Sequence, residues 1–238
     1  MNIALIGYGK MGKEIEQIAV NRGHSVVLKI DINNTEELTI ENLSRSDVAI
    51  EFTSPSTAFN NFMQCFEAGV PVVSGTTGWL DMKAEVEKKC SEKKGCFFYA
   101  SNFSLGANIL FEMNRNLARI MKQFPQYDVS ITEVHHTQKL DAPSGTAITL
   151  ATDIIGLHGA KTNWTINEQK SNDELYICSI REGTVPGIHT INYNSEEDFI
   201  SITHSAHSRK GLALGAVLAA EFCIGRKGIL SMTDLLKF

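Results

Sequence analysis

Fifteen residues near the middle of the chain, 133–147, concentrate groups that can transfer protons and bind anions. Two adjacent histidines, His135 and His136, are followed by Lys139 and then by the run Ser144-Gly145-Thr146. Histidine changes its charge near neutral pH, and lysine can donate a proton and attract an anion. Ser144 can cap a helix that begins at the next residue, and the first N–H groups of that helix would form an anion site. The pattern predicts a site for a small acid with two carboxylates.

The same residues permit a plainer interpretation. Paired histidines often lie on a surface or bind a metal, and the run Pro-Ser-Gly-Thr at 143–146 is an ordinary helix start. A metal site needs several ligands at suitable spacing, and no third ligand is evident beside His135 and His136. We therefore expect no metal. From spacing alone, the functional and the structural interpretations stay equally open, because only geometry can confirm such a site.

A glycine-rich loop at the start of the chain is the second group of interest. Gly7-Tyr8-Gly9-Lys10-Met11-Gly12 matches the G-x-G-x-x-G pattern between a predicted first strand and a predicted first helix. The glycines allow a tight turn, close approach of a pyrophosphate and close packing of the helix on the strand. Asp31 ends the second predicted strand, where a carboxylate accepts hydrogen bonds from the adenine ribose. The loop predicts a dinucleotide site.

Asp31 also bears on which dinucleotide binds. It is followed by Ile32-Asn33-Asn34 without an arginine, which favours NADH, whereas Lys10 can reach a 2′-phosphate. We expect NADH to be preferred, with NADPH also used. Two further segments end predicted strands and can contact the cofactor: Gly75-Thr76-Thr77-Gly78 and Ala100-Ser101-Asn102-Phe103. An ordinary tight turn explains the first of them equally well.

The elements that position these residues follow two patterns. Over residues 1–103, short apolar runs alternate with helical patterns, which predicts a Rossmann-type, doubly wound parallel sheet. The predicted strands are 3–7, 25–31, 47–52, 71–75 and 96–100, and the predicted helices are 10–22, 55–69 and 80–94. The fold class is therefore α/β for this part of the chain.

Beyond residue 103 the pattern changes. Helices are predicted at 105–124 and at 145–155, the second ended by Gly156, and strands at 127–135, 174–181, 188–193 and 199–204. Strands without intervening helices indicate a central α+β domain, 104–209, with a mixed open sheet. Helical patterns at 212–224 and 232–236 are expected to return to the first domain, which then comprises 1–103 and 210–238.

Composition excludes several classes of protein. Hydrophobic residues make up 43% of the 238 residues and the formal net charge is −5, which argues against disorder and against a dedicated binder of nucleic acid or anionic membrane. The cysteines number 5, with no C-x-x-C pair, and favour a reducing compartment. With no basic leader and no membrane-length apolar run, we expect a cytoplasmic protein.

The segment from His135 to Ala147 closely resembles the motif of the 4-hydroxy-tetrahydrodipicolinate (dihydrodipicolinate) reductase family. The resemblance extends to residues 7–12, 75–78, 100–104, 181–183, 187, 189 and 208–209. It implies NAD(P)H-dependent reduction of 4-hydroxy-tetrahydrodipicolinate to tetrahydrodipicolinate with loss of water, in the diaminopimelate route to lysine. It also implies a homotetramer assembled through the central sheet.

The resemblance further implies roles for individual residues. His135 would donate or accept a proton, and Lys139 would donate one to the substrate ring. Substrate carboxylates would be bound by His136, Ser144, Gly145 and Thr146. The cofactor would be held by Gly7, Tyr8, Gly9, Lys10, Met11, Gly12, Asp31, Gly75, Thr76, Thr77, Ala100, Ser101, Asn102 and Phe103. Arg209 is a further candidate for a carboxylate contact, and an ordinary surface arginine explains it as well.

Two features depart from the family pattern. The stretch between Asp31 and Asp47 is short, which would trim the adenine side of the cofactor site, and Glu51 stands where Asp is more frequent. Two other functions fit the glycine loop: a different amino-acid reductase or dehydrogenase, such as an aspartate dehydrogenase, and a nucleotide-sensing protein without catalysis. A different reductase or dehydrogenase would not need the His-His and lysine arrangement. An assay of NADH oxidation distinguishes an enzyme from a nucleotide-sensing protein.

Overall fold

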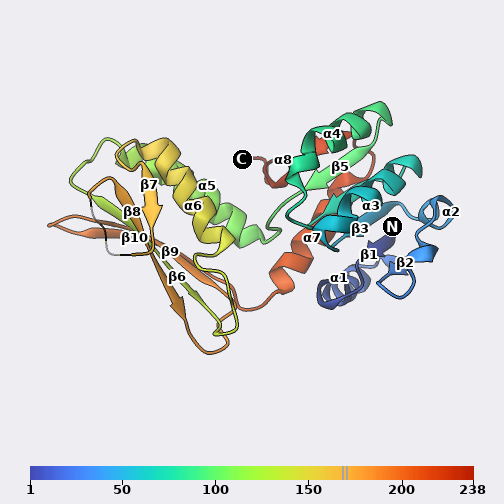
Figure 1. The fold of residues 1–238 in the computed structure, drawn as a ribbon, viewed down its shortest axis with the longest axis horizontal. Helices are drawn as coiled ribbons and strands as arrows, with labels where there is room; N and C mark the ends of the chain where they lie inside the picture. Colours follow the sequence, from blue (N-terminus) through green and yellow to red (C-terminus); the bar gives the residue numbers. More distant parts are fainter. Residues whose placement is uncertain (168, 170) are drawn as a thin grey trace. The chain divides into compact units, whose positions relative to one another are not determined.

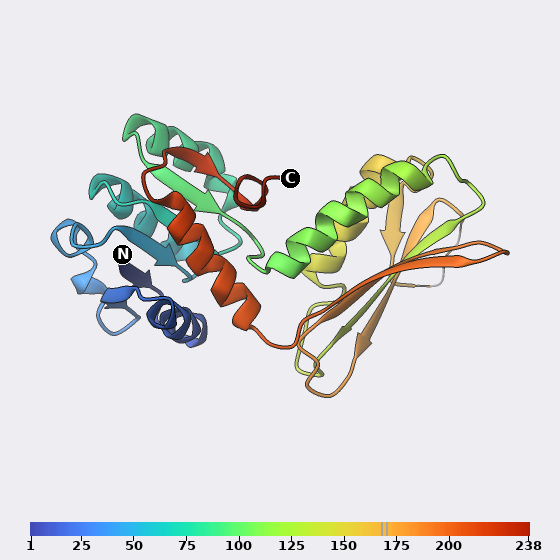
Figure 2. The same ribbon diagram turned by 180° about the vertical axis from the view of Figure 1, so that it is seen from behind.

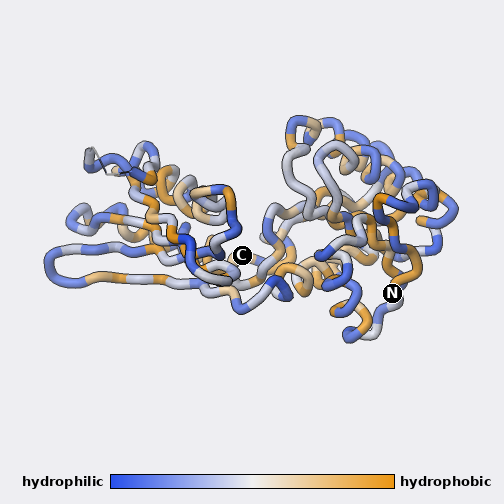
Figure 3. Tube along the Cα trace, turned by 60° about the horizontal axis from the view of Figure 1, so that its bottom comes forward, coloured by the Kyte–Doolittle hydropathy of each residue, from blue (hydrophilic) through white to orange (hydrophobic). Residues whose placement is uncertain are grey.

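The computed structural model describes residues 1–167, 169 and 171–238, which divide into two compact units. Unit 1 comprises Met1–Ser104 and Lys210–Phe238, and unit 2 comprises Leu105–Arg209. Hydrophobic and hydrophilic stretches alternate along the chain in both units (Figure 3). Across the described residues, no helix is both long and apolar enough to cross a membrane.

Unit 1 is built on a six-stranded sheet in which every strand pair is parallel (Figure 1). The order across the sheet is β11-β5-β4-β3-β1-β2. The strands are β1 (Asn2–Ile6), β2 (Ser25–Ile30), β3 (Val48–Glu51), β4 (Val72–Ser74), β5 (Cys96–Tyr99) and β11 (Gly228–Leu230). The five predicted strands are present with slightly different bounds. β11 was not predicted, because a three-residue strand carries no alternation and pairs with a distant partner, β5.

Helices cover both faces of this sheet, as the predicted doubly wound fold requires. Helices α1 (Lys10–Asn21) and α7 (Lys210–Cys223) lie side by side on one face (Figure 2), and α3 (Pro55–Glu67) and α4 (Lys83–Glu92) lie on the other (Figure 1). The helix predicted at 80–94 begins as a separate 3₁₀ turn, Leu80–Met82. The shorter elements are a 3₁₀ turn at Thr35–Glu37, α2 (Ile40–Leu43) and α8 (Met232–Leu236).

An aromatic cluster fills the core under α3 and α4. Phe62 has no exposed surface, and its ring centroid lies 5.1 Å from that of Trp79 and 5.0 Å from that of Phe97, both edge-on. Edge-to-face pairs of this kind contribute about 0.5–1.5 kcal/mol beyond the burial of their area. The cluster therefore anchors the half of unit 1 that carries the β3 and β4 loops.

Unit 2 contains the predicted mixed sheet, with strand order β10-β9-β6-β8-β7. Its strands are β6 (Asp128–His135), β7 (Asn163–Thr165), β8 (Glu174–Arg181), β9 (Ile188–Asn194) and β10 (Phe199–Ser205). β6 pairs antiparallel with β9 and parallel with β8. The short strand β7, which was not predicted, adds a parallel edge beside β8.

Two helices, α5 (Leu105–Met121) and α6 (Gly145–His158), pack together against one face of this sheet (Figure 1). The prediction that Gly156 ends the second helix was wrong. The helix continues through Gly156 to His158, and Gly159 ends it with a φ of +79°, in the left-handed conformation that glycine adopts without strain. A glycine inside a helical pattern can be mistaken for such a cap.

Alternation along β6 decides which of its side chains face the helices. Val129, Ile131, Glu133 and His135 are buried, while the intervening residues are half-buried. The side-chain period of a strand therefore puts a carboxylate and an imidazole on the same face as the hydrophobic core. Both lie at the carboxyl end of the strand, next to the loop that leads to α6.

Replacement of Phe62 by alanine should lower the free energy of unfolding of unit 1 by about 3–5 kcal/mol, because it opens a cavity within the aromatic cluster. Guanidinium unfolding followed by Trp79 fluorescence in a Trp164→Phe background measures this loss. Phe238→Ala is the matched control, since Phe238 is 49% exposed and should cost far less. Equal losses in the two variants would contradict this assignment of the core.

Candidate active site

The glycine loop leaves β1 in a conformation that two of its glycines make possible. Gly7 has a φ of +99°, and a Cβ atom there would lie 1.9 Å from the carbonyl oxygen of Phe52. A Cβ on Gly12 would lie 2.5 Å from the carbonyl oxygen of Gly7. Gly9 precedes α1 without a side-chain cap, so the first N–H groups of this helix are left for water or an anion. The loop thus has the geometry of a phosphate-binding turn.

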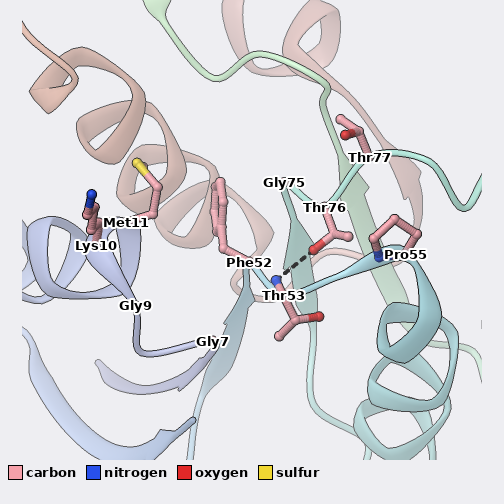
Figure 4. A pocket seen from close by; sticks show the side chains of 10 residues that line it. All are labelled: Gly7, Gly9, Lys10, Met11, Phe52, Thr53, Pro55, Gly75, Thr76 and Thr77. Carbon is pink, nitrogen blue, oxygen red and sulfur yellow. Dashed lines mark hydrogen bonds between the residues drawn. The ribbon is translucent and has the colours of Figure 1, made fainter. Parts of the chain in front are cut away.

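Two cavities border this loop. The smaller, of about 310 Å³, lies between the start of α1 and the loops that follow β3 and β4 (Figure 4). The larger, of about 820 Å³, lies beside the ends of β1 and β2 and the start of α3. Of the residues predicted to hold the cofactor, the cavities are lined by Gly7, Tyr8, Gly9, Lys10, Met11, Asp31, Gly75, Thr76 and Thr77. These residues therefore converge on one side of unit 1.

The other predicted cofactor residues lie elsewhere in unit 1. As far as the described residues define the two linings, Gly12 and the segment Ala100–Phe103 are outside both. Gly12 lies against the loop backbone, since a Cβ atom there would be 2.5 Å from the carbonyl oxygen of Gly7. Phe103 is 1% exposed and packs against Phe52 and Phe98, with ring centroids 5.7 and 5.9 Å away. Its side chain belongs to the core.

A buried carboxylate supports the two loops that line the smaller cavity. Glu51, at the end of β3, has no exposed surface. It accepts hydrogen bonds from the hydroxyls of Ser74 (2.7 Å) and Thr76 (2.9 Å) and from the N–H and hydroxyl of Thr53. The Thr53 N–H also donates to the Thr76 hydroxyl at 2.8 Å (Figure 4). Glu51 was singled out in the sequence only as a departure from the family, so this role was missed.

Polar contacts also organise the rim of the larger cavity. The hydroxyl of Tyr8 donates to Glu16, which pairs with Lys29 at 2.6 Å. The hydrogen bond to Glu16 raises the pKa of the Tyr8 hydroxyl above its ordinary value. The Asp31 carboxylate accepts the N–H of Asn33 at 2.7 Å, and Lys10 is exposed at the start of α1. Tyr8 is thus held as a neutral ring at the edge of the cavity.

The residues of the middle segment gather in unit 2, around the end of β6. Glu133, with no exposed surface, lies at the centre. Its Oε2 is 3.3 Å from Nδ1 of His135 and 3.9 Å from Nε2 of His189, and its Oε1 accepts a hydrogen bond from Arg181 at 3.0 Å. His135 is not aligned for a hydrogen bond to Glu133, so the contact is electrostatic.

The loop after β6 carries Lys139 and ends at α6. Lys139 donates to both carboxylate oxygens of Asp141, each at 2.8 Å. Arg181 donates to the carbonyl oxygen of Asp141 at 2.6 Å. The hydrogen bond from the Lys139 side chain lowers the pKa of Asp141 below its ordinary value. The ammonium group is therefore held at the surface of the loop by a carboxylate two residues away.

Ser144 caps α6 as predicted. Its hydroxyl accepts the N–H of Ala147 at 3.2 Å and lies 3.1 Å from Nε2 of His189, and its own N–H donates to Glu133 at 3.0 Å. Gly145 is exposed, and Thr146 and His136 are half-buried. The N-terminal turn of the 14-residue helix α6 is thereby fixed beside His135 and His189. Arg209, the last residue of unit 2, is exposed.

Burial is the largest influence on the pKa values of His135 and His189. Burial lowers the pKa of His135, and Lys139 and Arg181 act in the same direction against the opposing charge of Glu133. Burial, together with the charge of His135, lowers the pKa of His189 to about 4. For Glu133, burial favours the neutral acid, but hydrogen bonds from the Ser144 N–H and from Arg181 favour the carboxylate, and the pKa of Glu133 is lowered. At neutral pH the cluster therefore combines a carboxylate with neutral imidazoles.

Glu133, His135 and His189 also lie close enough together to offer ligand atoms to a metal ion, a grouping that the sequence did not reveal. Their potential ligand atoms lie within 4.8 Å of one another. The expectation of no metal was based on the absence of a third ligand beside His135 and His136, whereas the group in the structure omits His136 and includes Glu133 and His189. However, Glu133 already accepts hydrogen bonds from Arg181 and from the Ser144 N–H. The positive charge of the Arg181 guanidinium would repel a metal ion bound to the same carboxylate, which disfavours a metal at this position.

Sequence reasoning assigned no role to Glu133, Arg181 or His189. Each stands in a strand, and the contacts depend on the pairing of strands far apart in the sequence: His135 lies opposite Arg181 in β8, and Glu133 opposite His189 in β9. The alternation of β6 was a usable signal, because a Glu and a His on the apolar side of a strand are unusual core residues.

Comparisons with known proteins identify the family of the chain. Family models described as dihydrodipicolinate reductase, N-terminus and C-terminus, match residues 1–103 and 106–236. The chain is 49% identical to a 4-hydroxy-tetrahydrodipicolinate reductase of Christiangramia forsetii, over 99% of this chain and 98% of the relative.

The chain belongs to the dihydrodipicolinate reductase family. A second member, from Neisseria gonorrhoeae, is 32% identical over 93% of this chain and 83% of the relative. A dipicolinate-bound dihydrodipicolinate reductase from Paenisporosarcina sp. TG-14 shares the fold, with a TM-score of 0.80, 24% identity and 98% of each chain covered. The reductases of this family use NAD(P)H and act in lysine biosynthesis.

The lowered pKa of His189 predicts acid destabilisation of unit 2. Between pH 6.5 and about 4 the unfolded chain binds a proton at this residue and the folded chain does not, so stability falls as the pH falls through this range. The shift corresponds to about 3 kcal/mol. Unfolding free energies of the wild type and His189→Gln, measured against pH, should differ in slope. His207→Gln, at an exposed position, should keep the wild-type slope, and the same slope in all three proteins would contradict the prediction.

Proposed function

We propose that the chain catalyses the NAD(P)H-dependent reduction of 4-hydroxy-tetrahydrodipicolinate to tetrahydrodipicolinate with loss of water, the reaction implied by its family. The observation that carries the proposal is the loop between β6 and α6. Within ten residues it brings a buried imidazole, a lysine and the N-terminus of a helix, while the other unit has a dinucleotide-type loop. A protein that only senses a nucleotide does not need the imidazole, the lysine and the helix N-terminus of the β6–α6 loop.

The substrate carries two carboxylates, and the start of α6 suits one of them. The N–H groups of Gly145 and Thr146 and the positive end of the helix dipole attract an anion, and His136 and Ser144 stand beside them. Lys139 adds a positive charge on the same loop. The chain as a whole is acidic, with a formal net charge of −5, so these local donors must outweigh the overall field.

Lys139 and His135 are the proposed acid–base groups. After water leaves the hydroxylated ring and hydride adds at C4, the resulting enamine needs a proton at the neighbouring carbon. Lys139, held by Asp141 at 2.8 Å, is a charged donor that a bound substrate can reach at the loop surface. His135 donates or accepts a proton, and its lowered pKa keeps the imidazole neutral at pH 7.

Unit 1 is the proposed dinucleotide-binding domain. Gly7 to Gly12, Asp31, Gly75 to Thr77 and the backbone of Ala100 to Phe103 hold the cofactor, whose nicotinamide supplies the hydride. The support is the tight glycine turn, the uncapped start of α1 and the two cavities beside it. Asp31 on the rim favours NADH, and Lys10 allows NADPH.

Unit 2 is the proposed substrate-binding and oligomerisation domain. The family implies a homotetramer assembled through the central sheet. The exposed apolar side chains of that sheet are consistent with such an interface: Phe199 is 70% exposed, and Ile180 and Ile200 are each 39% exposed.

The reaction is tested by supplying the product of the preceding synthase in a coupled assay and following the loss of NADH absorbance. Lys139→Ala should lower kcat by about 10²- to 10⁴-fold, the usual contribution of a general acid, with the KM for NADH near that of the wild type. Lys122→Ala, at an exposed position of the same unit, is the control. Wild-type turnover in Lys139→Ala would remove this residue from the mechanism, and no turnover in the wild type would refute the function.

Cofactor preference is a separate measurement. The ratio of kcat/KM for NADH to that for NADPH should exceed one in the wild type, because the Asp31 carboxylate repels a 2′-phosphate. Asp31→Ser should lower this ratio and Lys10→Ala should raise it. A large wild-type preference for NADPH would overturn the assignment of Asp31.

A further inference from the structure

Glu133 contacts both ends of the loop that carries the proposed catalytic groups, but the mechanism above gives it no role. At the start of the loop, its Oε2 lies 3.3 Å from Nδ1 of His135. At the end of the loop, the same oxygen accepts the N–H of Ser144 at 3.0 Å. The carboxylate has no exposed surface, so water does not weaken these contacts.

Arg181 extends the reach of this carboxylate to the middle of the loop. One nitrogen of its guanidinium donates both to Oε1 of Glu133, at 3.0 Å, and to the carbonyl oxygen of Asp141, at 2.6 Å. Asp141 in turn holds the ammonium group of Lys139. A continuous chain of polar contacts therefore joins Glu133 to Lys139.

The opposite edge of the His135 ring is also fixed. Gly187 lies close to the ring, since a Cβ atom there would be 3.0 Å from Nε2 of His135, a tighter contact than most Cβ atoms make. The ring of His189 stands edge-on to that of His135, with centroids 5.0 Å apart. His135 is thus enclosed by backbone on one side, by an imidazole on another and by the Glu133 carboxylate at Nδ1.

We propose that Glu133 is a positioning residue of this active site: its buried carboxylate orients His135 and holds the Lys139 loop through Arg181. The inference deepens the proposed function, because it gives His135 and Lys139 the catalytic roles assigned there. Glu133 itself acts through these residues and does not contact the reacting atoms.

The charges around His135 determine in which direction its titration midpoint should move in each variant. Glu133 lies on the same strand and favours the imidazolium, as does Asp141 in the following loop. Arg181 on β8 and Lys139 in the loop disfavour it. His189 on β9, which itself faces His204 on β10, adds positive charge only when it is protonated. Removal of Glu133 and removal of Arg181 should therefore shift the titration of His135 in opposite directions.

An NMR titration of the imidazole signals, without substrate or cofactor, tests this prediction directly. The His135 signal is identified by its loss in His135→Asn. Glu133→Gln keeps the shape of the side chain and should move the His135 midpoint to lower pH, whereas Arg181→Gln should move it to higher pH. Glu112→Gln, on the same unit but paired with Arg115, should leave it unchanged. An unchanged midpoint in both site variants, or shifts in the same direction, would overturn the proposal.

Kinetics supply a second readout. Glu133→Gln should lower kcat by about 10-fold or more, within the range of the whole acid–base contribution, and should move the limb of the pH–rate profile that reports His135. A purely structural role would lower the amount of folded enzyme without moving that limb, and this result would count against the proposal. Should Glu133→Gln fail to fold, Arg181→Gln carries the test, since Arg181 is partly exposed at the loop. The NMR titration needs no turnover, so its result stands even if the proposed reaction is wrong.

Discussion

The buried charge of Glu133 is the constraint on which the arrangement of unit 2 depends. An ionised carboxylate without exposed surface costs several kcal/mol unless charges and hydrogen bonds compensate it. Here the compensation comes from Arg181 on β8 and from the first turn of α6, each with a contact at 3.0 Å. Sheet register, helix start and loop conformation must therefore be correct together, because an error in any one leaves the charge unpaired.

Register is the most demanding of these conditions. Glu133 is opposite His189 in the antiparallel pair with β9, while His135 is opposite Arg181 in the parallel pair with β8. A slip of one residue in either pairing would turn the inward side chains of one strand to the other face of the sheet. The core on the same face, with Val129 and Ile131 fully buried, opposes such a slip. Hydrophobic packing thus protects the polar cluster.

Local patterns in the sequence were sufficient for the glycine turn, the Ser144 cap and most strands and helices, since each depends on neighbours a few residues away. Contacts between distant strands were not predictable in this way. Arg181 and His189 reach Glu133 only through strand pairing, and β11 is a strand only because it pairs with β5. Gly156 shows the opposite error, because a local helix-stop signal was overridden by the packing of the last turn of α6.

The two units contain contrasting buried carboxylates. Glu51, at the end of β3, is surrounded by hydroxyl and N–H donors, and the described residues offer it no ion pair. Glu133, at the end of β6, has a guanidinium. A carboxylate held by neutral donors stiffens a loop without adding positive charge nearby, whereas the Glu133–Arg181 pair also modulates the protonation of an adjacent imidazole.

Unit 1 is interrupted in the sequence, because α7 and β11 come from the last 29 residues, 210–238. α7 packs on β3, β4 and β5, and β11 completes the sheet edge beside β5. During synthesis on the ribosome, the amino-terminal strands therefore emerge long before the helix that covers one of their faces. Unit 2, being continuous, can finish folding first, and the nascent amino-terminal half keeps an apolar surface exposed until residues 210–238 have been synthesised.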